Sequence, residues 1–409
     1  MSRISNPSSS SGRPARALLA AVVAALFALT ACGGGGGGGE PSEPEGPPVT
    51  ATIIEPADAS ADVPTSTGIT FATENAAEAT VELADINGNR IDGELDEDGT
   101  TWRPTGQLEY ATTYVATVTA VGADGQNAIA TSTFTTMPEP EKTVRVFSFI
   151  GSDEVIGVGM PLRIQFLDDS GAPRPIPEEY RAEVERRMTV RSDPPQEGTW
   201  HWVSGAEVHY RPREFWQPGT QINYHLTTGG LPIDNGWYLR NDLNVGLSVG
   251  KSIIMTVDNA TKQMTVEVNG EVVRTIPVSL GEERWPSSSG TMVVMEKFEE
   301  TVFDTYDELG PEDGYRTDIQ YALRLTYGGE FIHAAPWSVE DQGVRNVSHG
   351  CVNMSTDNAK FLYELTHKWG DVVIVKGTER KLQPGNGWTD WNLSWEEYQR
   401  GSALYEAAG

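Results

Sequence analysis

The chain has 409 residues, 38% of them hydrophobic and 9% aromatic, which is enough apolar material for roughly two to four separately folded domains. Its formal net charge is −28 at pH 7. A surface that acidic repels the phosphates of nucleic acids, so nucleic acid is excluded as an expected partner.

The first 32 residues have the pattern of a bacterial lipoprotein signal. Arginines precede an apolar run at 17–30, which as a helix would span only about 21 Å and is too short for a membrane core of roughly 30 Å. The run ends in LTAC at 29–32, which resembles the site where such signals are cleaved and the new N-terminal cysteine is acylated. We therefore expect lipid on Cys32 and a location in the cell envelope, outside the cytoplasm and anchored to the plasma membrane. The alternative is a plain secretory signal.

The chain has two cysteines, and the lipid would occupy one of them. If Cys32 is acylated, Cys351 has no disulfide partner, even in an oxidising compartment. A lone thiol there suggests a chemical role, and the alternative is a buried, inert cysteine.

A flexible linker is expected at 33–48, where glycine, proline and glutamate leave almost nothing to bury.

A weak sequence repeat follows the linker. The triplet WRP that begins at Trp102 and the triplet YRP that begins at Tyr210 each precede a strand-like segment at the same spacing, 114–119 and 222–227. Short strands punctuated by turn residues predict two tandem immunoglobulin-like β-sandwich domains, at about 49–138 and 139–248.

A third, β-rich domain is expected at 249–378. Alternating segments at 252–257 and 263–268 are followed by an Asn-Gly turn and a strand at 272–278. Ser355 or Thr356 caps a predicted helix that ends at Gly370, and a buried strand follows at 372–375. The predicted fold is therefore mainly β, with two sandwiches, a catalytic domain with one or two helices, and a short tail.

The tail at 379–409 carries four aromatic residues whose spacing predicts a single helical stripe: Trp388, Trp391, Trp395 and Tyr398. Such a stripe docks a terminal helix onto its own protein, and the alternative is glycan binding.

The acidic segment at 285–315, with Phe303 as an isolated apolar point, predicts either a lid over a site or a strand pair with a long loop.

Three residues of the third domain suggest thiol chemistry. A thiol attacks carbonyl carbons as thiolate, and a neighbouring imidazole can take its proton. Cys351 lies in a His-Gly-Cys turn, and His333 ends a strand-like segment upstream. Gly350 permits a tight turn that leaves main-chain N–H groups available to a developing oxyanion.

These motifs resemble a known family. SHGCVN at 348–353, HAAPWS at 333–338 and GYRTD at 314–318 are similar to the active site of L,D-transpeptidases of the YkuD type, in the actinobacterial lipoprotein branch with tandem immunoglobulin-like domains. The resemblance implies 3→3 cross-linking of peptidoglycan: a cysteine forms a thioester with a tetrapeptide stem, releases D-alanine, and transfers the stem to an amine of a second stem.

The resemblance also implies roles for single residues. It assigns the nucleophile, the general base, an oxyanion donor and the turn glycine to Cys351, His333, Tyr315 and Gly350. It assigns contacts with the stem or the walls of its pocket to His349, Asn353, Trp337, Ser348 and Phe303. Two positions depart from many family members: Ala334 follows the base, so its orienting contact must come from a main-chain carbonyl, and Asn353 stands where an arginine is common.

No metal or organic cofactor is expected. The expected partners are peptidoglycan stem peptides, carbapenem β-lactams as inhibitors, and the membrane through the lipid. Three alternatives stay open: a zinc site built from His333, His349 and Cys351, an L,D-carboxypeptidase that uses water instead of an amine, and a wall-binding lipoprotein without catalytic activity.

Overall fold

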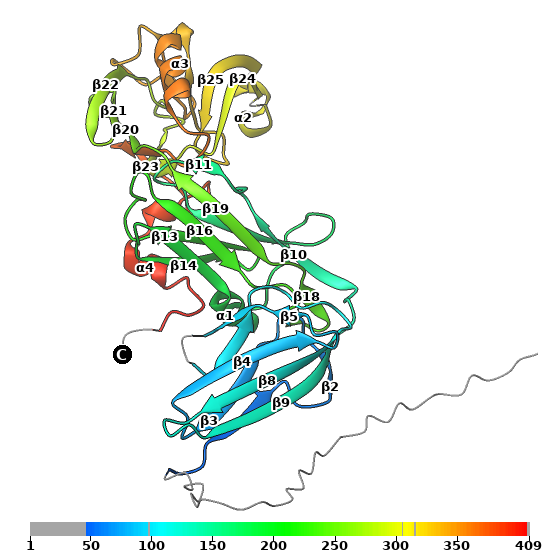
Figure 1. Ribbon diagram of the computed structural model, residues 1–409. Helices are drawn as coiled ribbons and strands as arrows, with labels where there is room; N and C mark the ends of the chain where they lie inside the picture. Colours follow the sequence, from blue (N-terminus) through cyan, green and yellow to red (C-terminus); the bar gives the residue numbers. More distant parts are fainter. Residues whose placement is uncertain (1–45, 97–98, 305, 315, 407–409) are drawn as a thin grey trace, which may run out of the picture. The chain divides into compact units, whose positions relative to one another are not determined.

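The computed structural model describes residues 46–96, 99–304, 306–314 and 316–406. The chain divides into two compact units, residues 1–46 and 47–409, and every helix and strand described below belongs to the second (Figure 1). The expected signal, the acylated Cys32, most of the linker and Tyr315 lie outside the described residues. Among the helices that are described, none has the length and apolar character needed to cross a bilayer.

The first domain is a sandwich of two sheets. The first sheet has the order β1 (Thr50–Glu55), β3 (Ile69–Glu74), β7 (Thr101–Pro104) and β6 (Gly93–Leu95). The second has the order β2 (Ser60–Val63), β9 (Asn127–Thr136), β8 (Thr113–Val121), β4 (Glu78–Asp85) and β5 (Arg90–Ile91). Phe71 and Trp102 of the first sheet meet Tyr114 and Phe134 of the second in one core, as alternating strands of a sandwich require.

The second domain is also a sandwich, with helix α1 (Glu178–Arg186) added. Its larger sheet has the order β14 (Gly198–Ser204), β15 (Glu207–Pro212), β12 (Leu162–Leu167), β10 (Lys142–Ser148), β18 (Trp237–Leu239) and β17 (Pro232–Asp234). Its smaller sheet has the order β11 (Glu154–Ile156), β19 (Leu243–Val249), β16 (Gln221–Leu226) and β13 (Met188–Asp193).

The two sandwiches share one topology, which explains the sequence repeat. The order β1-β3-β7-β6 in the first corresponds to β10-β12-β15-β14 in the second, and β2-β9-β8-β4 corresponds to β11-β19-β16-β13. Strands β2 and β11 even make the same parallel pairing, with β9 and β19. Trp102 and Tyr210 therefore occupy equivalent strands, and both are buried. The repeat reflects a shared need to fill the same position of the core.

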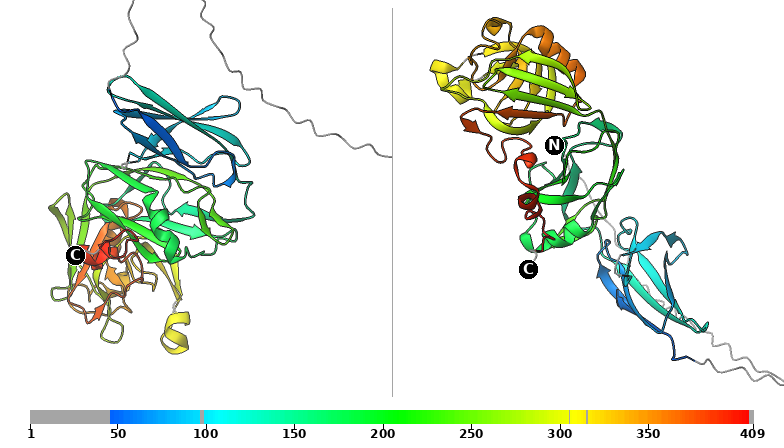
Figure 2. Two further views of the ribbon diagram at one scale, coloured as in Figure 1. Left: turned by 90° about the horizontal axis from the view of Figure 1, so that it is seen from below. Right: turned by 90° about the vertical axis from the view of Figure 1, so that its left-hand side faces the viewer.

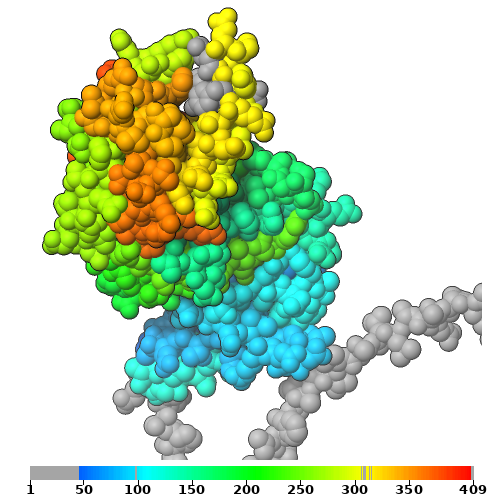
Figure 3. All heavy atoms as spheres, turned by 90° about the horizontal axis from the view of Figure 1, so that it is seen from above, coloured from blue at the N-terminus to red at the C-terminus, as the bar shows by residue number. Residues whose placement is uncertain are grey.

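The third domain consists of two further sheets. One has the order β22 (Glu271–Pro277), β21 (Gln263–Val268), β20 (Ile253–Asp258), β28 (Val372–Lys376), β23 (Ser288–Val293) and β29 (Arg380–Lys381). The other has the order β24 (Glu296–Asp304), β25 (Arg316–Arg324), β26 (Phe331–Ala334) and β27 (Val352–Met354). Helix α3 (Thr356–Leu365) packs against β25 and β26, and Figure 3 shows it in orange beside the yellow β24–β25 hairpin.

The helices of this domain follow the prediction with one correction. Ser355 caps α3 through a hydrogen bond that its side chain accepts from the Asn358 N–H, as expected. The helix does not continue to Gly370 but ends at Leu365, because Thr366 adopts an extended conformation and its hydroxyl donates to the Leu362 carbonyl. The segment predicted as a lid or a strand pair contains β24 and the connection to its partner β25, and this connection carries α2 (Tyr306–Asp313), interrupted at Gly310.

The aromatic tail packs against the second sandwich but not as one helix (Figure 2). Trp391 lies in the short 3-10 helix η2 (Asp390–Asn392), and Trp395 begins α4 (Trp395–Gln399). The predicted single stripe is wrong because the extended Leu393 separates the two helices and Ser394 starts the second with a capping box.

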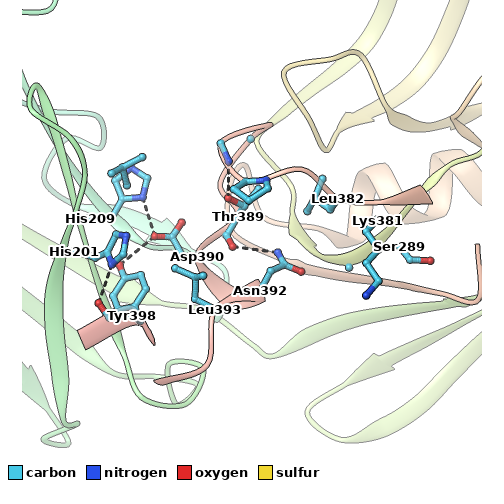
Figure 4. A pocket seen from close by; sticks show the side chains of 15 residues that line it. His201, His209, Ser289, Lys381, Leu382, Thr389, Asp390, Asn392, Leu393 and Tyr398 are labelled. Atoms are coloured by element: carbon cyan, nitrogen blue, oxygen red, sulfur yellow. Dashed lines mark hydrogen bonds and ion pairs between the residues drawn. The ribbon is translucent and has the colours of Figure 1, made fainter. Parts of the chain in front are cut away.

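Buried charges join the tail to the second sandwich. The His209 ring contacts the Asp390 carboxylate at 2.8 Å and the Glu207 carboxylate at 2.7 Å. Burial opposes the charged form of His209, but the two carboxylates outweigh it and raise its pKa. Figure 4 shows His209 and Asp390 on one side of a cavity of about 680 Å³, with Lys381 of the third domain on the other side. The tail therefore connects the second sandwich with the third domain.

Candidate active site

Strand β26 holds His333 in the centre of the third domain. All four residues of the strand are buried, and Ile332 pairs with Leu323 of β25. On its other side β26 runs parallel to β27, with His333 in register with Asn353. Residues in register on neighbouring strands present their side chains to the same face, roughly 4.8 Å apart. The sheet thus places the two residues side by side.

The loop before β27 holds Cys351 through internal hydrogen bonds. The Ser348 hydroxyl donates to the Cys351 carbonyl at 2.6 Å and accepts from the Gly350 N–H at 3.1 Å. The Ser287 hydroxyl donates to the Gly350 carbonyl at 2.7 Å. Gly350 itself has a φ of 124°, a conformation that favours glycine, so a residue with a side chain would strain the turn.

Cys351 and His333 line one cavity of about 290 Å³. Trp337, with 59% of its surface exposed, stands at its rim. The lining residues are Thr317, His333, Trp337, Val347, Ser348, His349, Cys351 and Asn353. Only 8% of the Cys351 surface is exposed, but the residue lines this opening, and it carries the free thiol of the described residues.

The contact of the His333 ring with the main chain fixes its tautomer. Its Nδ1 lies 2.9 Å from the Ala334 carbonyl oxygen. Because a carbonyl can only accept, Nδ1 carries the proton, and Nε2 of the neutral ring is left with a free lone pair. The expected main-chain orienting contact at Ala334 is confirmed, and His333 can act as a base through Nε2.

Burial disfavours the charged forms of both the thiol and the imidazole. Burial raises the pKa of Cys351 to about 12, and burial lowers the pKa of His333 to about 4. The Cys351 thiol donates to the Gly329 carbonyl, with a sulfur–oxygen distance of 3.7 Å. Burial therefore favours a neutral pair over a thiolate with an imidazolium, because two buried charges would lose more solvation than their attraction returns.

The other predicted contact residues have different surroundings. His349 is exposed and its ring lies 4.4 Å from the ring of Trp285, at the cavity mouth. The hydroxyl of Ser348 is used inside the loop, so its main part is structural. Phe303 does not line the cavity: it is buried against Phe331 and against the edge of His333, where it contributes to desolvation of the base. Its expected contact with substrate stays a prediction.

A buried acidic residue near the nucleophile was not predicted. Glu330 accepts hydrogen bonds from the Ser288 N–H and hydroxyl and pairs with Arg380 at 2.6 Å. Its negative charge adds to the rise in the pKa of Cys351. Only its position next to a buried strand distinguished it in the sequence. Thr317, in contrast, belongs to the GYRTD segment already noted and lines the cavity.

The described residues contain no group of three or more His, Cys, Asp or Glu side chains arranged to hold a metal ion. In particular, His333 uses Nδ1 on a carbonyl, while the exposed His349 packs against an indole ring.

Comparison with known proteins identifies both parts of the chain. The family model of the L,D-transpeptidase catalytic domain (YkuD) matches residues 252–375, and that of a bacterial Ig domain matches residues 60–232. Among solved structures, the LD transpeptidase LdtMt1 in complex with imipenem has 30% identity and a TM-score of 0.48, covering 58% of this chain and 100% of that chain.

Two curated relatives match over most of their length. The chain is 33% identical over 368 residues to L,D-transpeptidase 5 of Mycobacterium tuberculosis (strain ATCC 25618 / H37Rv), covering 88% of this chain and 78% of the relative. It is 36% identical over 329 residues to L,D-transpeptidase 2 of Mycobacterium tuberculosis (strain CDC 1551 / Oshkosh), covering 80% and 78%. The chain therefore belongs to the L,D-transpeptidase family.

Proposed function

We propose that the protein forms 3→3 cross-links between peptidoglycan stem peptides through a thioester on Cys351. The observation that supports this most is that Cys351 and His333 line one cavity, with the Nδ1 proton of His333 engaged by a carbonyl. That tautomer leaves Nε2 as a base beside the thiol.

In the first half-reaction, the sulfur of Cys351 attacks the carbonyl carbon between meso-diaminopimelate and D-alanine, and the thiol proton passes to Nε2 of His333. The carbon–nitrogen bond then breaks, His333 gives the proton to the departing nitrogen, and D-alanine leaves. The Cys351 main-chain N–H and the Tyr315 hydroxyl are proposed to stabilise the oxyanion, at about 3 kcal/mol for one such donor.

In the second half-reaction, the side-chain amine of another stem attacks the thioester. The amine loses one proton to His333, the carbon–sulfur bond breaks, and the proton returns to the sulfur. A carbapenem carries a strained amide carbonyl that offers the same electrophile, so we propose that it acylates Cys351 when its ring opens.

We further propose that lipid on Cys32 anchors the protein to the outer face of the plasma membrane, with the two sandwiches as a spacer toward the wall. Support comes from the signal pattern of the first 32 residues. Replacement of Cys32 by serine should abolish incorporation of radiolabelled palmitate and release the protein from membranes. Continued labelling of the Cys32→Ser variant would contradict the anchor.

The enzymatic proposal is tested with a disaccharide-tetrapeptide and mass spectrometry. With the wild type, one D-alanine should be released from the tetrapeptide for each dimer formed. The wild-type protein should also gain the mass of an added carbapenem. The Cys351→Ala variant should neither form the dimer nor gain this mass. Loss of D-alanine without dimer would show a carboxypeptidase. If the wild type leaves the substrate unchanged, the protein is more consistent with wall binding than with catalysis. The melting curves of the wild type and of Cys351→Ala must match, so that both proteins are known to be folded.

A further inference from the structure

Asn353 carries a buried amide at the edge of the cavity. Only 3% of the residue is exposed. One side of its main chain is held by Ser279, because its N–H donates to the Ser279 carbonyl at 2.8 Å and its carbonyl accepts from the Ser279 N–H at 3.0 Å. On the opposite side it is in register with His333. Its side chain therefore has little freedom to move away from the base.

The hydrogen bonds around Ser338 fix the orientation of this amide, which belongs to a residue that lines the cavity. The Ser338 hydroxyl donates to the Ala335 carbonyl at 3.2 Å, so its oxygen is left to accept. The Asn353 Nδ2 donates to that oxygen at 3.3 Å. The amide oxygen, Oδ1, is then the other end. It is buried, and within the described part of the chain it has no hydrogen-bond partner.

A buried acceptor without a donor is costly, and such atoms point to a ligand that supplies one. Nε2 of His333, on the neighbouring strand, is a second acceptor that opens on the same cavity. Two acceptors on adjacent strands match one nitrogen that carries two N–H bonds. This is the hydrogen-bond pattern of a primary amine.

We propose that Asn353 is a specificity-determining residue that favours a primary amine over water as the nucleophile that resolves the thioester. This inference rests on the proposed function. As the amine lone pair attacks the thioester carbon, one N–H is transferred to His333 Nε2 and the other donates to Asn353 Oδ1. The carbon–sulfur bond breaks, the sulfur recovers the proton from His333, and the new amide keeps the N–H on Asn353.

The preference arises because the two nucleophiles differ in their freedom to turn. The nitrogen of an attacking amine has four tetrahedral positions. Three are taken by the carbon substituent, the forming bond and the proton given to His333, so the remaining N–H can point in only one direction. Without an acceptor there it would be desolvated and unpaired. Water has no substituent and can turn its remaining O–H toward another water. Loss of Oδ1 therefore penalises the amine and spares hydrolysis.

The test is the partition of one thioester between two products. The full chain is incubated with tetrapeptide donor and a fixed concentration of acceptor stem, and the ratio of cross-linked to hydrolysed product is measured by mass. This ratio does not depend on how fast the thioester forms. Asn353→Leu, which keeps the volume but removes Oδ1, should lower it about tenfold.

Gln342→Leu provides the matched control. It removes a buried amide that donates to the Ala335 carbonyl and to the same Ser338 hydroxyl, but it retains both Ser338 and Asn353 Oδ1, so it should leave the ratio close to that of the wild type. An unchanged ratio in Asn353→Leu, or an equal fall in Gln342→Leu, would overturn the inference, while cross-linking by the wild type would still support the proposed function. If the wild type forms neither the cross-linked nor the hydrolysed product, the proposed function is refuted.

A second test needs no folded variant. An acceptor stem whose amine carries one N-methyl group has a single N–H to give, and the methyl group would meet Oδ1. The wild type should prefer the primary amine over this acceptor by about tenfold or more. In Asn353→Ala, which also creates space, the preference should shrink. Equal use of the two acceptors by the wild type would contradict the inference.

Discussion

At the scale of single residues, burial of the Cys351 thiol and of the His333 ring sets the protonation state in which the reaction begins. The low pKa of His333 and the high pKa of Cys351 favour a neutral pair over an ion pair. In the proposed reaction the proton would therefore cross as the sulfur attacks, once the substrate carbonyl can take up the developing charge. The reactivity of the sulfur then depends on the bound substrate and not on a standing thiolate.

This protonation state predicts the pH dependence of acylation. Above about pH 4 the Nε2 of His333 is unprotonated and can accept the thiol proton, and below it the ring is charged and cannot. The rate constant for acylation by a carbapenem, followed by intact mass, should be flat from about pH 5 to 8 and fall about tenfold per unit below 4. A fall in the acylation rate constant centred near pH 6.5 would show that burial does not set the pKa of His333.

At the scale of elements, the site depends on how one loop is tied to the strands around it. Glu330 lies directly before β26, is buried, and pairs with Arg380 of β29, which belongs to the other sheet. The same carboxylate receives two hydrogen bonds from Ser288. This ion pair links both sheets of the third domain behind the Cys351 loop.

Removal of Arg380 should be damaging because it leaves the buried Glu330 carboxylate without its cation. We expect Arg380→Met to lower the free energy of unfolding by about 2 kcal/mol and to slow acylation of Cys351, since a nearby uncompensated negative charge opposes the oxyanion. Chemical denaturation and carbapenem acylation rates measure the two effects.

The double variant Glu330→Gln/Arg380→Met is the control. It should recover part of both losses, because the charge is gone together with its partner. Additive losses in the double variant would mean that the two side chains are not coupled.

Local sequence patterns predicted much of the fold and less of the connections within it. The YRP triplet at Tyr210 and the Asn-Gly turn at 269–270 are local signals, and the structure has strands and a tight turn there. The prediction of one helix in the tail was wrong because it used only the spacing of the aromatic residues. The spacing of Trp391 and Trp395 fits a helix, but the cap at Ser394 decides where the helix starts. Helix α1 was not predicted, although two glutamates stand in its first turn and an arginine in its last.

The site shows the same division. Cys351 and His333 were found because the chemistry constrains their residue types and the motif places them close in sequence. The partners of Asn353 and Glu330 lie on other elements, and no local pattern reports a contact between residues 330 and 380. The neutral state of the pair depends on burial by residues such as Phe303, which is a property of the packed structure.

At the scale of the whole molecule, the tail holds the second sandwich and the third domain together. Trp391 donates its indole N–H to the Gly159 carbonyl of the sandwich at 2.7 Å, and the Asn392 amide donates to the Thr291 carbonyl of β23 at 2.7 Å. The charged His209 adds its contacts to Asp390. A spacer fixed in this way would present the catalytic domain in a defined direction.

Replacement of His209 by glutamine should weaken this connection in a pH-dependent way. The folded pKa of His209 is raised, so its stabilising charge is fully present below about pH 6.5 and is lost as the pH rises through the folded pKa. We expect His209→Gln to cost about 3 kcal/mol at pH 6, because Asp390 loses its buried partner, and progressively less at alkaline pH.

Calorimetry at several pH values measures this difference, and His225→Gln, on a more exposed ring of the same sandwich, serves as the control. A penalty for His209→Gln that grows with pH would mean that the histidine is neutral in the folded protein.

The protonated state of Cys351 also bears on its survival. Peroxide oxidises thiolates far faster than thiols, and sulfenic acid formed on an unpaired cysteine is readily carried on to irreversible forms. An enzyme that we propose to work outside the cytoplasm has no glutathione pool to repair it. A sulfur that keeps its hydrogen until a peptide arrives would be spared this damage during the long intervals between turnovers.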